Sequence, residues 1–240
     1  FCSMYKDEKY QEVPLQEIEQ ELMNGDPYTE RVFLTGADPL AVGYERMLRI
    51  LKLIKKYFPY CGCVAAYASV RSLKRYSVGE LAALHREGLR LLYVGFETGN
   101  DEVLAFMKKG NTAEEAIQQG RKLTEANMIF NAIIMYGIAG KDKCVENAKR
   151  TAKMLNQLKP RKIITMNLTV FQGTELASLV KEGKFAEAGV KEKIREIKSL
   201  IENLDVEKRV EFDTTHATNL VKLQGWLPEQ REEFIEKLEA

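Results

Sequence analysis

The sequence lacks the features that mark several classes of protein. Its 240 residues contain no apolar run near the length of about 18 residues that a membrane-spanning helix needs, so we expect no membrane association. Four cysteines are too few for the disulfide framework of a small secreted protein. The 36 basic and 35 acidic side chains nearly balance, without the basic excess typical of nucleic-acid-binding proteins. We therefore expect a cytoplasmic protein for which nucleic acid is not a partner.

The sequence also lacks an initial methionine and a zinc-binding pattern. It begins at Phe1-Cys2, and we expect that a segment before these residues is missing. The two histidines are too few and too far apart for a zinc site. We expect Cys61 and Cys63 to be core or surface thiols rather than metal ligands, and Cys144 to pack on the apolar stripe of its helix.

Short apolar segments alternate with amphipathic segments along the whole chain. The apolar segments predict strands over residues 31–34, 62–67, 89–96, 128–136 and 162–170. Apolar residues at helical spacing follow, as in 44–57, where Met47, Ile50, Leu51 and Ile54 form one stripe. Two capping boxes, Ser77 with Glu80 and Thr112 with Glu115, predict helix starts. Repeated strand–helix units indicate a parallel sheet covered by helices, either a barrel or a doubly wound sheet.

The first predicted helix, around residues 15–22, has no strand before it. A strand preceding Phe1 would complete the six parallel strands of a partial (β/α)6 barrel of the TIM type, so the predicted fold is an α/β barrel whose first strand is missing. No change in composition divides the chain. We predict one domain over 1–240, with a C-terminal helical extension over about 205–240.

The loops after the predicted strands are rich in glycine and carry the candidate functional residues. In parallel α/β proteins, reactive groups lie just beyond the C-terminal ends of strands. Taken singly, the glycines turn the chain and the carboxylates cap helices, but their recurrence at one edge favours a ligand site. The segments are Gly36-Ala37-Asp38-Pro39, Ser69-Val70-Arg71, Glu97-Thr98-Gly99, Gly137-Ile138-Ala139-Gly140 and Phe171-Gln172-Gly173-Thr174.

Several segments together resemble one enzyme family. Phe1-Cys2, LTGADPL (34–40), YVGFETGNDEVL (93–104) and KKGNTAEEA (108–116) occur in an order similar to that of the radical S-adenosylmethionine (radical SAM) enzymes. The resemblance covers nearly the whole chain and is greatest to the branch of coproporphyrinogen oxidase-like and uncharacterised iron–sulfur oxidoreductases. That family has a CxxxCxxC loop after its first strand, with an aromatic residue often preceding the third cysteine. Phe1 and Cys2 match that position.

The resemblance implies two cofactors and assigns residues to them. Cys2 would be one of three thiolate ligands of a [4Fe–4S] cluster whose fourth iron binds the methionine moiety of S-adenosylmethionine (SAM), and Phe1 would lie near the adenine. Gly36 to Pro39 stand where the family has Gly-Gly-Glu-Pro, whose backbone receives the methionine amino group. Glu97 matches an acidic residue that reaches the ribose or the methionine. Gly137 and Gly140 match a glycine-rich motif beside the adenine.

The implied reaction is the reductive cleavage of SAM to a 5′-deoxyadenosyl radical that acts on an unidentified small-molecule or peptide substrate. It requires a reducing electron donor. Arg71, just beyond the strand over 62–67, is a candidate partner for a carboxylate of the cofactor or substrate. The first two cysteines of the motif are absent from the sequence, so we expect the chain as given to be inactive.

Two other functions stay open from the sequence. A barrel that keeps the nucleotide-like pocket without a cluster would be a binding or carrier protein. A cluster-free α/β-barrel enzyme is the third possibility. The residues before Phe1 distinguish them, because a CxxxCx segment there supports the radical enzyme and a strand and loop without cysteines supports the others.

Overall fold

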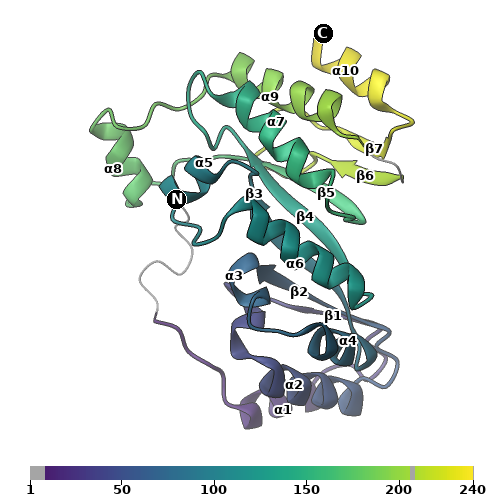
Figure 1. Cartoon of the computed structure of the whole chain (residues 1–240). Coiled ribbons are helices and arrows are strands. Elements are labelled where there is room, and N and C mark those ends of the chain that lie inside the picture. The colour runs from purple at the N-terminus through teal and green to yellow at the C-terminus, as the bar shows by residue number, and fades with distance from the viewer. Residues whose placement is uncertain (1–8, 206–208, 240) are drawn as a thin grey trace. The chain divides into compact units, whose positions relative to one another are not determined.

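The computed structural model describes residues 9–205 and 209–239. Seven strands in this part of the chain follow one another in a sheet in the order β1 to β7 (Figure 1). By its internal contacts the described chain divides into two compact units. One, here called the β1–β3 unit, comprises residues up to 95 together with 121–130, and the other, the β4–β7 unit, comprises 96–120 and the residues from 131 onward.

The β1–β3 unit is built on three parallel strands, β1 (Arg31–Leu34), β2 (Cys63–Ser69) and β3 (Leu89–Glu97). One face of this sheet is buried, as Ala66 and Leu92 show at one register position. The helices of the unit are α1 (Leu15–Met23), the 3₁₀ helix η1 (Pro39–Val42), α2 (Tyr44–Tyr57), α3 (Val70–Leu73) and α4 (Val78–Arg86). Helix α2 buries Met47, Ile50, Leu51 and Ile54, which confirms the predicted apolar stripe.

Both predicted capping boxes are present. At the start of α4 the backbone N–H of Glu80 donates to the Ser77 hydroxyl oxygen (3.2 Å), and the backbone N–H of Ser77 donates to the Glu80 carboxylate (2.7 Å). Thr112 and Glu115 make the same reciprocal pair, at 3.2 and 2.8 Å. Each box satisfies backbone donors that a helix start leaves free, and so fixes where the helix begins.

The β4–β7 unit contains β4 (Ile129–Tyr136), β5 (Lys162–Asn167), β6 (Val210–Asp213) and β7 (Gln224–Leu227). The β4/β5 and β5/β6 pairs are parallel, and the β6/β7 pair is antiparallel. Helices α7 (Cys144–Leu155) and α9 (Val190–Asn203) pack against each other over this sheet (Figure 1). The further helices are α5 (Asp101–Phe106), α6 (Ala113–Glu125), α8 (Glu175–Lys181) and α10 (Arg231–Glu239), and the residues of α6 from 121 onward belong to the β1–β3 unit.

The α/β class with mostly parallel strands is confirmed, but the C-terminal part differs from the prediction. The predicted helical extension over about 205–240 contains β6 and β7 before its helix α10. Each of these strands has four residues and lacks the continuous apolar run that marked the equally short β1 in the sequence. Trp226 lies in β7, where the guanidinium of Arg209 sits 4.3 Å from its ring centroid. The predicted strand before Phe1 lies outside the described residues, and the single domain stays a prediction.

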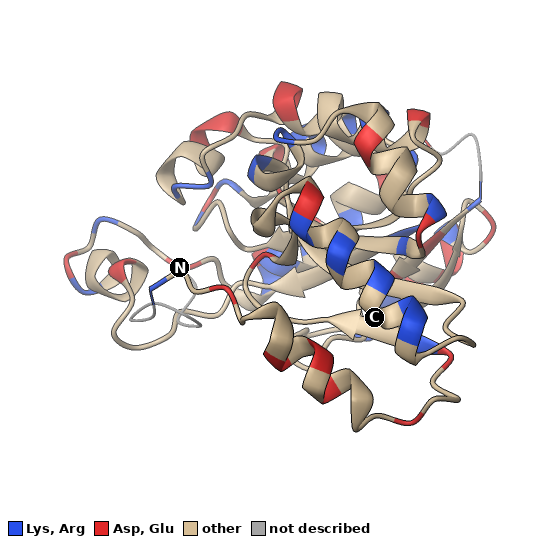
Figure 2. Cartoon of the chain, turned by 90° about the horizontal axis from the view of Figure 1, so that it is seen from below, with Lys and Arg blue, Asp and Glu red and all other residues tan. Residues whose placement is uncertain are grey.

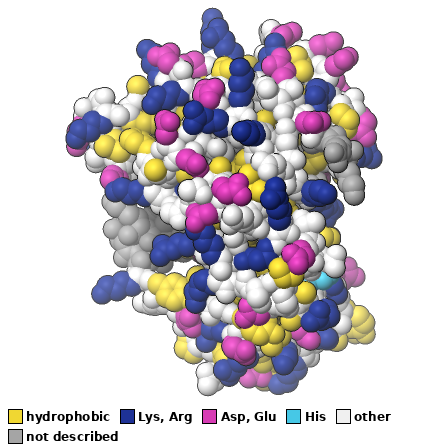
Figure 3. All heavy atoms as spheres, viewed as in Figure 1, with side chains coloured by type: hydrophobic (Ala, Val, Ile, Leu, Met, Phe, Trp, Pro, Cys, Tyr) yellow, Lys and Arg dark blue, Asp and Glu magenta, His cyan; other side chains and the backbone are white. Residues whose placement is uncertain are grey.

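Charged residues of both signs are mixed along the chain. Figure 2 shows acidic and basic positions within the same helices, and on the face drawn in Figure 3 their side chains are interspersed. Within the described residues, no helix combines the length and the apolar character that crossing a membrane requires.

Candidate cofactor site

The loop after β1 places Gly36 to Pro39 at the C-terminal end of that strand, as predicted. Asp38 Oδ2 accepts a hydrogen bond from Ser69 Oγ at the end of β2, at 2.6 Å. The other oxygen, Asp38 Oδ1, is buried and has no hydrogen-bond partner among the described residues. A buried acceptor without a donor costs about 1–3 kcal/mol, so this atom fits a ligand that brings an N–H or O–H group.

The chain on both sides of Asp38 is held in a defined conformation. Gly36 has a φ of +111°, which residues with a side chain rarely adopt, although no atom lies within 4 Å of where a Cβ would be. After Asp38, the hydroxyl of Tyr76 donates to the carbonyl of Leu40 at 2.7 Å inside the protein. Burial raises the pKa of Tyr76, so its hydroxyl stays a donor at neutral pH.

Arg71 lies two residues after Ser69, whose side chain hydrogen-bonds to Asp38. The Ser69 side chain also accepts a hydrogen bond from the Ser72 backbone and so caps the short helix α3. The Arg71 side chain is exposed, and no ion pair to it is found in the described part of the chain. Its guanidinium is therefore available to a carboxylate from outside.

Glu97 ends β3 in a conformation that requires explanation. Its φ is +64°, a left-handed value that is uncommon for a residue other than glycine. The side chain is buried and its Oε1 accepts from the Lys109 ammonium at 2.9 Å. Such strain costs about 1–3 kcal/mol and persists where the surroundings fix it, often at functional sites. Lys109 escaped the sequence reasoning because nothing in its local pattern sets it apart from the exposed Lys108, which pairs with Glu175 at 2.6 Å.

The turn after β4 is closely packed. Gly137 and Gly140 have φ values of +76° and +79°. A Cβ on Gly140 would lie 2.8 Å from the carbonyl oxygen of Ala186 and 2.9 Å from the ring of Phe185, so only glycine fits. The backbone N–H of Gly137 donates to Glu196 Oε2 at 2.7 Å.

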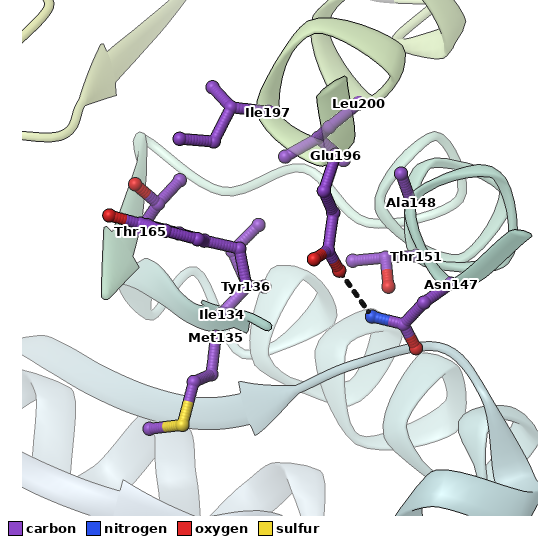
Figure 4. A pocket seen from close by; sticks show the side chains of 10 residues that line it. All are labelled: Ile134, Met135, Tyr136, Asn147, Ala148, Thr151, Thr165, Glu196, Ile197 and Leu200. Atoms are coloured by element: carbon purple, nitrogen blue, oxygen red, sulfur yellow. Dashed lines mark hydrogen bonds between the residues drawn. The ribbon is translucent and has the colours of Figure 1, made fainter. Parts of the chain in front are cut away.

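A buried polar network lies behind the strand ends of the β4–β7 unit. Glu196 on α9 accepts from Asn147 on α7 at 2.8 Å, and the two side chains face each other in Figure 4. Asn147 in turn accepts from the Thr98 hydroxyl at 2.7 Å. Sequence reasoning missed these residues, although Glu196 lies at helical spacing with the buried Leu200 and Leu204, a polar residue on an apolar stripe.

The cysteines of the described residues show no metal site. No group of three or more His, Cys, Asp or Glu residues there has a geometry that could hold a metal ion. Cys144 is buried, as expected for a packed side chain, and burial raises the pKa of its thiol. Cys63 begins β2 and Cys61 lies two residues before it, and both are half-buried. Phe1 and Cys2, predicted to contact the adenine and the cluster, lie outside the described residues.

The structure brings the predicted site residues together in two groups. In the β1–β3 unit the Asp38 loop joins Ser69, and in the β4–β7 unit the network connects Thr98, next to Glu97, with Gly137. The common edge expected for the Asp38 and Glu97 loops concerns residues of different units and stays a prediction.

Comparison with known families adds to this geometry. Residues 1–152 match the family model of the Radical SAM superfamily, which covers more than half of the 240 residues. The chain belongs to the radical SAM superfamily. Membership implies a [4Fe–4S] cluster and SAM as cofactors. No curated protein matches the sequence significantly.

Solved structures share the radical SAM fold with this chain. Coproporphyrinogen III oxidase (HemN) from Escherichia coli aligns with a TM-score of 0.63 and 18% identity over 79% of this chain and 44% of that chain. The archaeal Methanocaldococcus infernus Elp3 aligns with a TM-score of 0.58 and 17% identity, over 87% and 53%. Methylornithine synthase (PylB) aligns with a TM-score of 0.56 and 15% identity, over 95% and 72%. The chain thus spans about half of Elp3 and HemN, and the likeness is one of fold.

Proposed function

We propose that this protein reductively cleaves SAM at a [4Fe–4S] cluster and abstracts hydrogen from an unidentified substrate. The match of residues 1–152 to the superfamily carries the proposal. The buried Asp38 Oδ1, which has no hydrogen-bond partner among the described residues, supports it, because this acceptor suits the ammonium group of SAM. When bound and reduced, the cofactors supply a 5′-deoxyadenosyl radical, and the residues of the chain bind and orient them.

Each residue in the described part of the proposed site has a chemical task. Ser69 fixes Asp38 through one oxygen, so the second oxygen is preorganised to accept from the methionine ammonium. Glu97, held by Lys109, offers its remaining oxygen to a ribose hydroxyl. The exposed Arg71 guanidinium suits a carboxylate of the methionine or of the substrate.

The other assignments complete the proposal. The turn from Gly137 to Gly140 would lie beside the adenine, Phe1 would contact that ring, and Cys2 would be a thiolate ligand of the cluster. An electron donor reduces the bound cofactors. The substrate is a small molecule or a peptide rather than a nucleic acid, and the reaction takes place in the cytoplasm.

Iron analysis of the intact gene product after anaerobic reconstitution tests the proposal. The wild type should hold one oxygen-sensitive [4Fe–4S] cluster, and Cys2→Ala should lose it, because two thiolates hold a cubane far less well than three. If the wild type retains no more iron than Cys2→Ala, the radical mechanism is wrong. The cluster-free binding or carrier protein then takes its place.

A second arm separates the SAM contacts from the cluster. Glu97→Gln should keep its iron and weaken SAM binding by about 1–3 kcal/mol, because it removes an outer polar contact. Glu175→Gln is the matched control, since Glu175 also pairs with a lysine but is exposed. Equal SAM affinity of these two variants would remove Glu97 from the site.

A further inference from the structure

Two of the loops assigned to SAM are joined by side chains that touch neither cofactor in the proposal. One loop runs from Glu97 to Asn100 after β3, and the other from Gly137 to Gly140 after β4. From Gly137 the connection passes to Glu196 (2.7 Å), then to Asn147 (2.8 Å) and then to Thr98 (2.7 Å). Hydrogen bonds thus connect the two loops without interruption.

Every side chain of this connection is inside the protein. Glu196, Asn147 and Thr98 are 3%, 2% and 0% exposed. In Figure 4, Glu196 reaches from α9 toward Asn147 on α7, above the strands that carry Tyr136 and Thr165. A hydrogen bond in such a dry environment is strong, and leaving one of these groups without a partner is costly.

The burial of the Glu196 carboxylate is not explained by the packing of α9. A leucine would continue the apolar stripe at this position without the desolvation cost of a carboxylate. The carboxylate accepts from the Gly137 backbone N–H and the Asn147 amide, and the Cys144 thiol interacts with it as well. The carboxylate therefore serves to hold the backbone of the loop after β4.

The other end of the connection fixes the loop after β3. The Thr98 hydroxyl oxygen accepts from the Asn100 backbone N–H at 3.1 Å and lies 3.0 Å from the Thr151 hydroxyl. Thr151 also accepts from the backbone N–H of Gly99 at 3.1 Å. These bonds hold the residues that directly follow Glu97, whose left-handed backbone needs such support.

We propose that Glu196 and Asn147 are positioning residues. They fix the position of the two loops relative to each other and thereby determine the affinity for SAM. The part that concerns SAM rests on the proposed function. The coupling of the loops does not, because it is a property of the chain alone.

The donor and acceptor pattern gives a variant and its rescue. Asn147→Asp would place a second carboxylate at the 2.8 Å contact with Glu196, and at a pH where both groups are ionised they only accept. Adding Glu196→Gln restores one donor to that contact while the glutamine oxygen still accepts from Gly137. The double variant should therefore recover the hydrogen bond between positions 147 and 196 that the single variant loses.

Amide hydrogen exchange measures the coupling without any cofactor. In Asn147→Asp the Gly99 and Gly137 amides should exchange about tenfold faster, and in the double variant within about threefold of wild type. Glu146→Gln, which changes an exposed carboxylate on α7, is the control and should leave both amides unchanged. Faster exchange throughout the unit instead of at these loops, or no recovery in the double variant, would overturn the proposal.

Thr98→Val keeps the test decisive if Asn147→Asp does not fold. It removes a hydroxyl that has no contact with Gly137, so faster exchange at Gly137 requires transmission through Asn147 and Glu196. An unchanged Gly137 amide would contradict the coupling. SAM binding to the reconstituted protein should weaken about tenfold in Asn147→Asp and recover in the double variant. If wild type binds no SAM while the exchange results hold, the proposed function fails and the coupling stands.

Discussion

The loops after β1 and β4 both contain left-handed glycines but differ in how their polar groups are used. In the loop after β1, Asp38 Oδ1 is left without a partner in the described chain, and Gly36 has free space around it. In the turn after β4, the Gly137 N–H is bound to Glu196, and Gly140 is enclosed by Ala186 and its neighbours. The first loop keeps an acceptor for a ligand. In the second, Glu196 and the residues packed around Gly140 fix the conformation of the backbone.

The same substitution in the two loops should separate packing from backbone conformation. Gly140→Ala places a Cβ 2.8 Å from a backbone carbonyl and strains φ, so we expect a loss of at least about 3 kcal/mol in the free energy of unfolding. Gly36→Ala meets no atom and should lose about 1–2 kcal/mol from φ alone. Urea denaturation of both variants measures the difference. Equal losses would mean that the turn after β4 is not closely packed.

Removing one hydroxyl group that supports each network should lower the free energy of unfolding by unequal amounts. Thr98→Val leaves the Asn147 oxygen and the Asn100 N–H without partners in the interior, at a cost of about 1–3 kcal/mol. Ser69→Ala removes a helix cap and one partner of Asp38 in a half-buried position, at about 1 kcal/mol. Thermal denaturation of the two variants compares them. A larger loss of stability for Ser69→Ala than for Thr98→Val would contradict this expectation.

Asp38→Asn should affect ligand binding more than folding. The asparagine oxygen still accepts from Ser69, but an amide replaces the free acceptor, so SAM should bind about 1–3 kcal/mol more weakly. The melting temperature should stay near that of wild type, because no intramolecular bond is lost. Titration with SAM alongside a melting curve provides both readings. Unchanged SAM affinity would remove Asp38 from the cofactor site.

The smallest expected effect concerns pH. Burial raises the pKa of Glu196 above its ordinary value of 4.5, so the folded state holds this proton to higher pH than the unfolded state. The free energy of unfolding should therefore fall as pH rises from about 4.5 through the raised value. Glu196→Gln lacks this contribution, and its stability relative to wild type should increase over that range. A constant difference between the two proteins would show that Glu196 does not titrate as its burial requires.

The sequence predicted what depends on local patterns. The stripe of Met47, Ile50 and Leu51 is buried, and the loops that carry Asp38 and Glu97 follow their strands as expected. These features arise from periodicity and from the rule that parallel strands end at one edge.

What the sequence could not predict depends on tertiary packing. The Glu196–Asn147 bond joins residues 49 positions apart, and only the packing of α9 on α7 brings them together. Glu97, which pairs with Lys109, has a left-handed backbone that no local signal marks in a residue other than glycine. The strands β6 and β7 have four residues each and lack a continuous apolar run, and they are stabilised by their neighbours in the sheet.

Product analysis tests most directly the proposal that this protein cleaves SAM. The intact gene product, reconstituted anaerobically, reduced and given SAM without substrate, should release 5′-deoxyadenosine and methionine in equal amounts. Cys2→Ala, treated in the same way, should release neither. Formation of both products at the same rate by wild type and Cys2→Ala, or by neither, would contradict the assignment of this protein as a radical enzyme.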